Sequence, residues 1–269
     1  MIVQTAPEGA PRFIIRMSEH TALAGAFARA FGNDRFERVE SEEAHFIIAN
    51  HDIGWAPLDA EYRLDPKTGF PYNLAETPFD LIMGTSRRSP DVNERRHPFC
   101  GLISSMHTWG LYNGRYGLSD AVLLDQIAHD HREMADAMLS HELARQDRLK
   151  ETLAADDEGA ELIGGEKVMA AYKQLQFFDT LALYFNRIHE DERKTAVFPH
   201  VPVNETDDVD ITITPLGGGR YSLSPWPFAG DRLTVSFEGR YMDARKGQER
   251  APEAAKLPVE TQTVTLVAG

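Results

Sequence analysis

The chain has 269 residues, 42% hydrophobic and 26% charged, values ordinary for a globular protein with a full core. Its net charge of −14 argues against a broad surface for nucleic acid or another polyanion, but allows a basic pocket. No apolar run approaches the ~18 residues of a membrane span, the first residues lack the features of a signal peptide, and Cys100, the one cysteine, excludes an internal disulfide. We therefore expect a cytoplasmic protein without a nucleic-acid or membrane partner.

The first hundred residues predict two short strands, two helices and a long loop. Residues 2–5 and 12–16 are typical of strands, and Ser18 predicts the start of a helix that ends at Gly32. Ser41, followed by two glutamates, predicts a second helix that ends near His51. Residues 55–98 are rich in proline, glycine and paired charges, and they predict a long loop with at most short helices.

The remainder predicts helices followed by strands. Ser119 indicates the start of a long helix through about Lys150, residues 156–161 form an acidic linker, and a last helix covers about 166–188. Strand alternation follows in residues 210–214, 220–223, 232–241 and 259–267. We predict an antiparallel sheet that includes the N-terminal pair. The class is α+β, with a helical metal-binding domain over 1–195 and a β-rich extension over 196–269 packed on it.

Polar side chains lie in apolar helical segments, where solvated residues are not expected. The residues Asn50-His51-Asp52-Ile53 close an apolar run that begins at Phe46. Burying adjacent imidazole and carboxylate groups is costly without a partner, and divalent metals take these ligands. Further histidines and one aspartate lie on comparable apolar faces: His20, His107, His131 and Asp179. His131 is preferred over His129 because it shares a predicted helix face with Ile127, Met134 and Met138. An isolated histidine on such a face is also common in ordinary cores.

The order His20, His51-Asp52, His107, His131, Asp179 resembles the H…HD…H…H…D pattern of the HD-domain superfamily, over about residues 12–190. Residues 47–54 resemble its HDIG signature, and residues 18–20, 51–55 and 105–112 are similar to an uncharacterised bacterial family of unknown function. The resemblance implies a helical bundle that binds two divalent metal ions, which could be Fe, Mn, Mg, Co or Zn. In this interpretation, His20, His51, Asp52 and Asp179 form the first position, Asp52 bridges, and His107 and His131 complete the second.

Three functions fit such a site. We predict a metal-dependent hydrolase of the phosphohydrolase type, acting on a small phosphorylated metabolite, with Asp52, His107 and His131 as catalytic residues. The first alternative is a non-haem di-iron oxygenase, since iron and manganese accept the same ligands. The second is a non-catalytic metal-binding sensor or scaffold, which would have a closed coordination sphere. A homo-oligomer is compatible with the sequence.

Residues close to the ligands in the chain are candidates for the substrate pocket. They are Trp55, Asp59, Arg63, Lys67, Trp109 and Tyr112. Arg63, Lys67, Arg87 and Arg88 could clamp a phosphate, although solvated surface charges have the same appearance in a sequence. Trp55 stands where many phosphohydrolases of the superfamily have a basic residue, a departure that weighs against phosphate.

Overall fold

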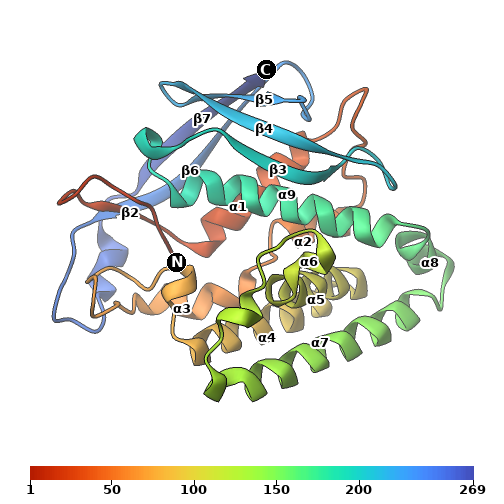
Figure 1. The fold of residues 1–269 in the computed structure, drawn as a ribbon, viewed down its shortest axis with the longest axis horizontal. Helices are drawn as coiled ribbons and strands as arrows, with labels where there is room; N and C mark the ends of the chain where they lie inside the picture. Colours follow the sequence, from red (N-terminus) through yellow and green to blue (C-terminus); the bar gives the residue numbers. More distant parts are fainter.

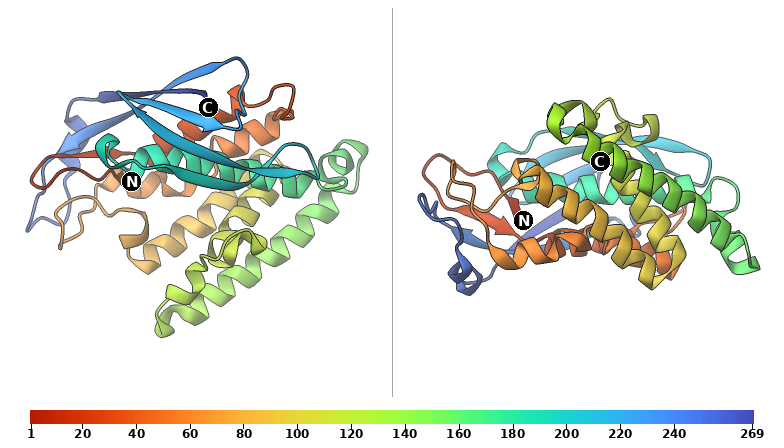
Figure 2. Two further views of the ribbon diagram at one scale, coloured as in Figure 1. Left: turned by 45° about the horizontal axis from the view of Figure 1, so that its top comes forward. Right: turned by 90° about the horizontal axis from the view of Figure 1, so that it is seen from below.

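The computed structural model describes residues 1–269, apart from the side chain of Ala75. A sheet covers one side of a helical body (Figure 1). The two further views show the strands gathered on one face and the longer helices on the other (Figure 2). The predicted α+β class is confirmed. Along the described residues, every helix is too short or too polar to span a bilayer.

The described strands form one seven-stranded sheet in the order β1-β2-β6-β7-β5-β4-β3. Their bounds are β1 Ile2–Val3, β2 Arg12–Ile15, β3 Ala196–Pro202, β4 Asp208–Gly217, β5 Arg220–Ser224, β6 Arg232–Met242 and β7 Glu260–Ala268. The N-terminal pair joins the sheet, as predicted, through antiparallel pairing of β2 with β6. The prediction of a purely antiparallel sheet is wrong, because β7 inserts between β6 and β5 and pairs with β5 in parallel. The predicted domain boundary near residue 195 falls just before β3, and one sheet unites strands from both sides of it.

The helices are α1 Met17–Ala30, α2 Glu42–Ile48, α3 Ala56–Glu61, α4 Phe79–Arg96, α5 Pro98–Tyr112, α6 Gly114–Gly117, α7 Arg132–Leu153, α8 Asp157–Ile163 and α9 Lys167–Arg187. Short 3-10 turns are η1 Ile53–Trp55, η2 Leu74–Glu76, η3 Leu123–Gln126, η4 His129–His131, η5 Glu190–Glu192 and η6 Pro252–Lys256. Helices α1 and α9 pack against each other beneath the sheet, α1 on β6 and α9 on β3 (Figure 1). Helices α2 and α5 pack against α9, and α4 and α7 pack on α5. Helix α9 is therefore central.

Its central position explains the composition of α9. Phe178, Leu181 and Phe185 are fully buried in the main core, which is continuous from the sheet to α5. The same helix also buries polar residues, among them Gln176, Asp179 and Asn186. Buried polar groups require partners, because each loses its hydrogen bonds to water. The middle of α9 is therefore where a site is expected.

Helix α4 corrects the prediction of a long loop over residues 55–98. Its sequence contains Pro90, which removes a backbone donor and normally ends a helix. Here the hydroxyl of Thr108 in α5 donates to the carbonyl of Ser86, four residues before Pro90, at 3.4 Å. The neighbouring helix thus provides a hydrogen bond that the proline cannot make.

Two further boundaries differ from the prediction. Residues 119–131 do not continue α7 toward Ser119, because Ile127 has an extended backbone that separates the turn η3 from η4, which leads directly into α7. The predicted linker at 156–161 is largely α8, whose first turn is capped by the carboxylate of Asp156, which accepts from the NH of Gly159 at 2.7 Å. Strand β3 was not predicted, because it contains Pro199 and a bulge between Phe198 and Val201.

Candidate metal centre

Five of the six predicted ligands meet at one place. His20 comes from α1, His51 and Asp52 from the turn after α2, His107 from α5 and Asp179 from α9. Two overlapping groups, His20 with His51 and Asp52, and His51 with His107 and Asp179, each have donor atoms within 4.8 Å of one another. Four segments, far apart in the sequence, thus direct metal-ligand atoms to a common point.

The turn that carries His51 and Asp52 is shaped by close packing. Helix α2 ends at Ile48, and Gly54 then lies against α4, where its NH donates to the hydroxyl of Ser89 at 2.9 Å. A Cβ atom on Gly54 would lie 2.4 Å from the carbonyl oxygen of Thr85. Glycine is therefore required at this position by close approach to α4, and the contact fixes the path of the chain just after the ligand pair.

The distances between donor atoms suit a shared cation. Nε2 of His20 lies 3.1 Å from Oδ1 of Asp179, and Nε2 of His51 lies 3.6 Å from the same oxygen. Nε2 of His51 is 3.7 Å from Oδ2 of Asp52. Two ligand atoms about 2.1 Å from one ion are roughly 3.0–3.6 Å apart when they subtend 90–120°. The observed separations are close to this range.

Each histidine ring is oriented by a contact at Nδ1. In His20 this atom donates to Oδ1 of Asn186 at 3.0 Å, and in His51 it donates to the carbonyl of Ile48 at 2.9 Å. In His107 this atom instead accepts from the amide nitrogen of Gln176 at 2.8 Å. Donation from Nδ1 leaves Nε2 of His20 and His51 as the free nitrogen, the arrangement common to metal-binding histidines, whereas the neutral ring of His107 carries its proton on Nε2.

The charges at the cluster call for a cation. Nε2 of His51 is buried and, among the described residues, has no hydrogen-bond partner. Burial opposes protonation of this ring, but Asp52 and Asp179 outweigh it and raise its pKa to about 9. Burial also favours protonation of Asp179, yet its contacts with His20 and His51 hold the pKa of the carboxyl well below its usual value. A positive charge is therefore stabilised between these groups, either as a proton on His51 or as a metal ion.

His107 differs from His51 in its charge. Burial, followed by the proximity of His51, lowers the pKa of His107 to about 4. Its side chain is therefore neutral near pH 7, as a metal ligand must be.

The structure does not bring His131 to the cluster. This residue closes the turn η4 and stacks on Phe79, with ring centroids 4.6 Å apart. The prediction assumed one continuous helix from Ser119, so that His131 would share a face with Ile127. Because the backbone of Ile127 is extended, that periodicity is lost before α7 begins.

A cavity of about 230 Å³ opens beside the cluster. Asp52, His107 and Asp179 form part of its wall, and two predicted pocket residues, Trp55 and Tyr112, line it as well. Its other lining residues are Met17, Leu74, Ile82, Thr85, Ser86, Ser89, Thr108, Leu111, Arg115, Leu123 and Leu183. The candidate centre therefore has an accessible side.

The other four predicted pocket residues lie outside this cavity. Asp59 accepts a hydrogen bond from the NH of Met17 at 2.6 Å and lines a separate cavity of about 330 Å³ that Asp52 also borders. Arg63 pairs with Glu61 at 2.6 Å, the NH of Lys67 is held in a turn by Asp65, and Trp109 packs on Tyr116 with centroids 4.7 Å apart. Proximity in sequence to the ligands therefore predicted only part of the wall of the cavity.

Three residues that contact or line the site were not predicted from the sequence. Gln176 and Asn186 lie three residues before and seven residues after Asp179, and so share its face of α9. That spacing of polar residues in an apolar helix was a usable signal. Arg115 lines the cavity from the turn α6, for which the sequence offers no comparable periodic signal.

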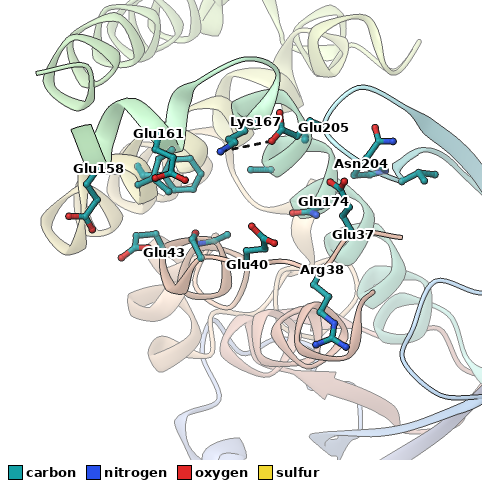
Figure 3. A pocket seen from close by; sticks show the side chains of 18 residues that line it. Glu37, Arg38, Glu40, Glu43, Glu158, Glu161, Lys167, Gln174, Asn204 and Glu205 are labelled. Atoms are coloured by element: carbon teal, nitrogen blue, oxygen red, sulfur yellow. Dashed lines mark hydrogen bonds and ion pairs between the residues drawn. The ribbon is translucent and has the colours of Figure 1, made fainter. Parts of the chain in front are cut away.

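A larger cavity lies at a different place. It measures about 520 Å³ and lies between α2, α8, α9 and the end of β3, with Glu37, Glu40, Glu43, Glu158, Glu161 and Glu205 among its lining residues (Figure 3). Lys167 pairs with Glu205 across it at 3.9 Å. Most of these glutamates are exposed to solvent, and neither of the two metal-ligand groups includes any of them.

Comparison with known families gives one match. A family model described as a protein of unknown function (DUF3891) covers residues 1–244. Comparison with curated proteins and with solved structures gave no match. The expected similarity to an uncharacterised family is confirmed, and the resemblance to the HD-domain superfamily stays a prediction.

Proposed function

The chain belongs to the DUF3891 family of proteins of unknown function, and we propose that it is a metal-dependent hydrolase of a small phosphorylated metabolite. The observation that carries the proposal is Nε2 of His51, a buried nitrogen without a hydrogen-bond partner among the described residues. It faces Asp52 and Asp179 at the wall of a cavity. A divalent ion would satisfy this nitrogen and both carboxylates at once.

His20, His51, Asp52 and Asp179 would hold the ion, with His107 beside them. When bound, such an ion lowers the pKa of a coordinated water and offsets charge on a phosphoryl group. The protein's part is orientation: Asn186 and the carbonyl of Ile48 hold the rings of His20 and His51 in the ligating tautomer.

Asp52 and His107 are the proposed catalytic residues. The Asp52 side chain is 18% exposed, more than that of the buried Asp179, and it lines the cavity. Its carboxylate is thus placed to accept the proton of an attacking water. His107 also lines the cavity and, being neutral near pH 7, is placed to hold a substrate oxygen without adding charge.

We propose one ion rather than two. The second position was assigned to His107 and His131, and of this pair only His107 reaches the cluster. The same argument disfavours the di-iron oxygenase, which needs ligands for a second iron. The scaffold alternative is disfavoured because two of the four proposed ligands, Asp52 and Asp179, border a cavity, whereas a purely structural site is closed.

Elemental analysis of protein purified without chelators or a metal-binding tag tests the proposal first. We expect about one equivalent of manganese, magnesium, cobalt or zinc, together with phosphate release from members of a phosphomonoester panel. Iron with substrate-dependent oxygen uptake by the reduced protein would replace the hydrolase by the oxygenase. Protein that binds none of these metals would overturn both.

A further inference from the structure

Four consecutive residues after α5, Gly114 to Gly117, have a left-handed backbone, with φ values of 63°, 53°, 59° and 86°. Glycine adopts this conformation readily, whereas Arg115 and Tyr116 do so against steric repulsion from Cβ. Adjacent non-glycine residues in this region are uncommon. Such strain persists where surrounding contacts impose it, and it concentrates at functional sites.

The contacts that hold this turn are made by Tyr116. Its hydroxyl donates to Oε1 of Gln146 at 3.0 Å. Its ring packs against Trp109 and meets Tyr172 edge-on, with centroids 4.7 and 5.2 Å apart. Tyr116 thereby anchors one side of the turn, while Arg115 lines the cavity beside the metal-ligand cluster.

Arg115 has no counterion in the described part of the protein. No carboxylate there lies within 4.0 Å of its guanidinium, and its side chain makes no hydrogen bond to a described residue. Arg145, which is more deeply buried than Arg115 with 7% exposure, contacts three carboxylates, those of Asp91, Glu94 and Glu142. A half-buried guanidinium normally has such partners, because its five donors are costly to desolvate unpaired.

We propose that Arg115 binds the phosphate group of the substrate and positions it against the metal-ligand cluster. The inference rests on the proposed function, since it deepens the description of the same site. A guanidinium binds phosphate with two parallel hydrogen bonds, which fix orientation as well as charge.

The cavity also limits the rest of the substrate. Its volume of about 230 Å³ is below the range usual for drug-sized ligands, so it admits a phosphate with a short organic group. The hydroxyl of Ser89, which accepts from the NH of Gly54, still has its proton to donate to a substrate oxygen, and Leu111 and Leu183 offer apolar contact. The geometry thus fits a small phosphomonoester rather than a nucleotide.

The role of Arg115 can be tested without turnover by measuring the binding of inorganic phosphate to the metal-loaded protein by calorimetry. Arg115→Met should weaken phosphate binding by about tenfold to hundredfold, the loss expected for charge-assisted hydrogen bonds. Arg115→Lys, which keeps the charge but not the fork, should lie between this variant and the unmodified protein. Arg95→Met, at an exposed position on α4, is the matched control and should bind phosphate normally.

Arg115→Gly separates binding from folding. Glycine relieves the left-handed strain, so this variant should unfold at or above the wild-type temperature while still losing phosphate affinity. A structural role for Arg115 predicts the opposite, a lower unfolding temperature with phosphate affinity retained, and would overturn the proposal. Binding of acetate but not phosphate by the unmodified protein would overturn it as well.

Failure of the proposed role of Arg115 can be distinguished from failure of the proposed hydrolase activity. Phosphate binding that depends on Arg115, without release of phosphate from any ester, would support the binding role and contradict hydrolysis. Hydrolysis that is unaffected by Arg115→Met, in kcat and in KM, would support the hydrolase and contradict the role of Arg115.

Discussion

The two cavities beside α9 differ in volume and in how deeply their charged groups are buried, and volume alone would select the wrong cavity as the candidate site. The acidic cavity is more than twice as large as the one beside the ligand cluster, about 520 against 230 Å³. Its glutamates, labelled in Figure 3, are mostly exposed, and exposed carboxylates are readily solvated. Beside the smaller cavity, the histidines and Asp179 are almost completely buried and already oriented. The cost of burying unpaired donors, rather than volume, identifies the candidate site.

Removing a ligand should have the largest effect. Asp52→Ala should abolish stoichiometric metal binding, because it removes a proposed ligand and one of the two carboxylates that favour a cation at His51. Elemental analysis measures the metal, and circular dichroism should show a largely intact helical fold.

Two variants provide controls for this experiment. His131→Ala, at the residue stacked on Phe79, and Glu161→Gln, in the acidic cavity, should both retain the metal. Stoichiometric metal in Asp52→Ala, or loss of metal in Glu161→Gln, would contradict the assignment of the metal to the ligand cluster rather than to the acidic cavity.

Loss of an orienting contact should have a smaller effect. Asn186→Leu removes the acceptor for Nδ1 of His20 and should weaken metal binding by about tenfold to hundredfold. A competitive chelator titration measures the change. Asn186→Asp keeps an acceptor oxygen and should bind more tightly than Asn186→Leu; equal affinity in the wild type and in Asn186→Leu would show that the hydrogen bond does not orient the ligand.

Metal affinity should also depend on pH, with a predictable sign. The pKa of His51 is raised to about 9 in the metal-free protein, so below that pH an incoming ion must displace a proton. Affinity should therefore fall as the pH is lowered from 9 to 7, by about tenfold per pH unit for one proton. A chelator titration at several pH values tests this, and an affinity independent of pH over that interval would argue against displacement of the His51 proton.

The smallest expected effect concerns the wall of the site. Gly54→Ala places a Cβ against the backbone of α4 and should lower the free energy of unfolding by about 1–3 kcal/mol, measured by urea denaturation. Gly84→Ala, in the same helix α4 but with open space around its Cβ, should instead raise it by roughly 0.5–1 kcal/mol. Equal stability of both variants would mean that α4 can move away from the ligand turn.

Five residues of the cluster could be predicted because they carry local signals. His20 and Asp179 interrupt apolar helix faces, and His51 follows a helix whose start at Ser41 is readable in the sequence. The same reasoning failed at His131, because it required an uninterrupted helix. The extended backbone of Ile127 is a tertiary outcome, and residue periodicity does not report it.

The features missed from the sequence depend on contacts between distant segments. Pro90 argued against a helix, and it is tolerated because Thr108 of another helix contacts the carbonyl of Ser86. The sheet order likewise depends on the insertion of β7, which strand alternation alone does not specify. Local patterns therefore predicted the type of each element better than they predicted which elements lie next to one another in the fold.

The position of β7 also sets the order of events during synthesis. This strand is last of the seven in the chain but lies between β6 and β5, so it joins one half of the sheet, β1-β2-β6, to the other, β5-β4-β3. Helix α1, with His20, packs on the first half, and α9, with Asp179, packs on the second. Until residues 260–268 leave the ribosome, the two halves have no strand between them. The sheet above the cluster is thus closed late in biosynthesis by pairing between distant parts of the chain, whereas α1 and α9, which carry His20 and Asp179, also contact each other directly.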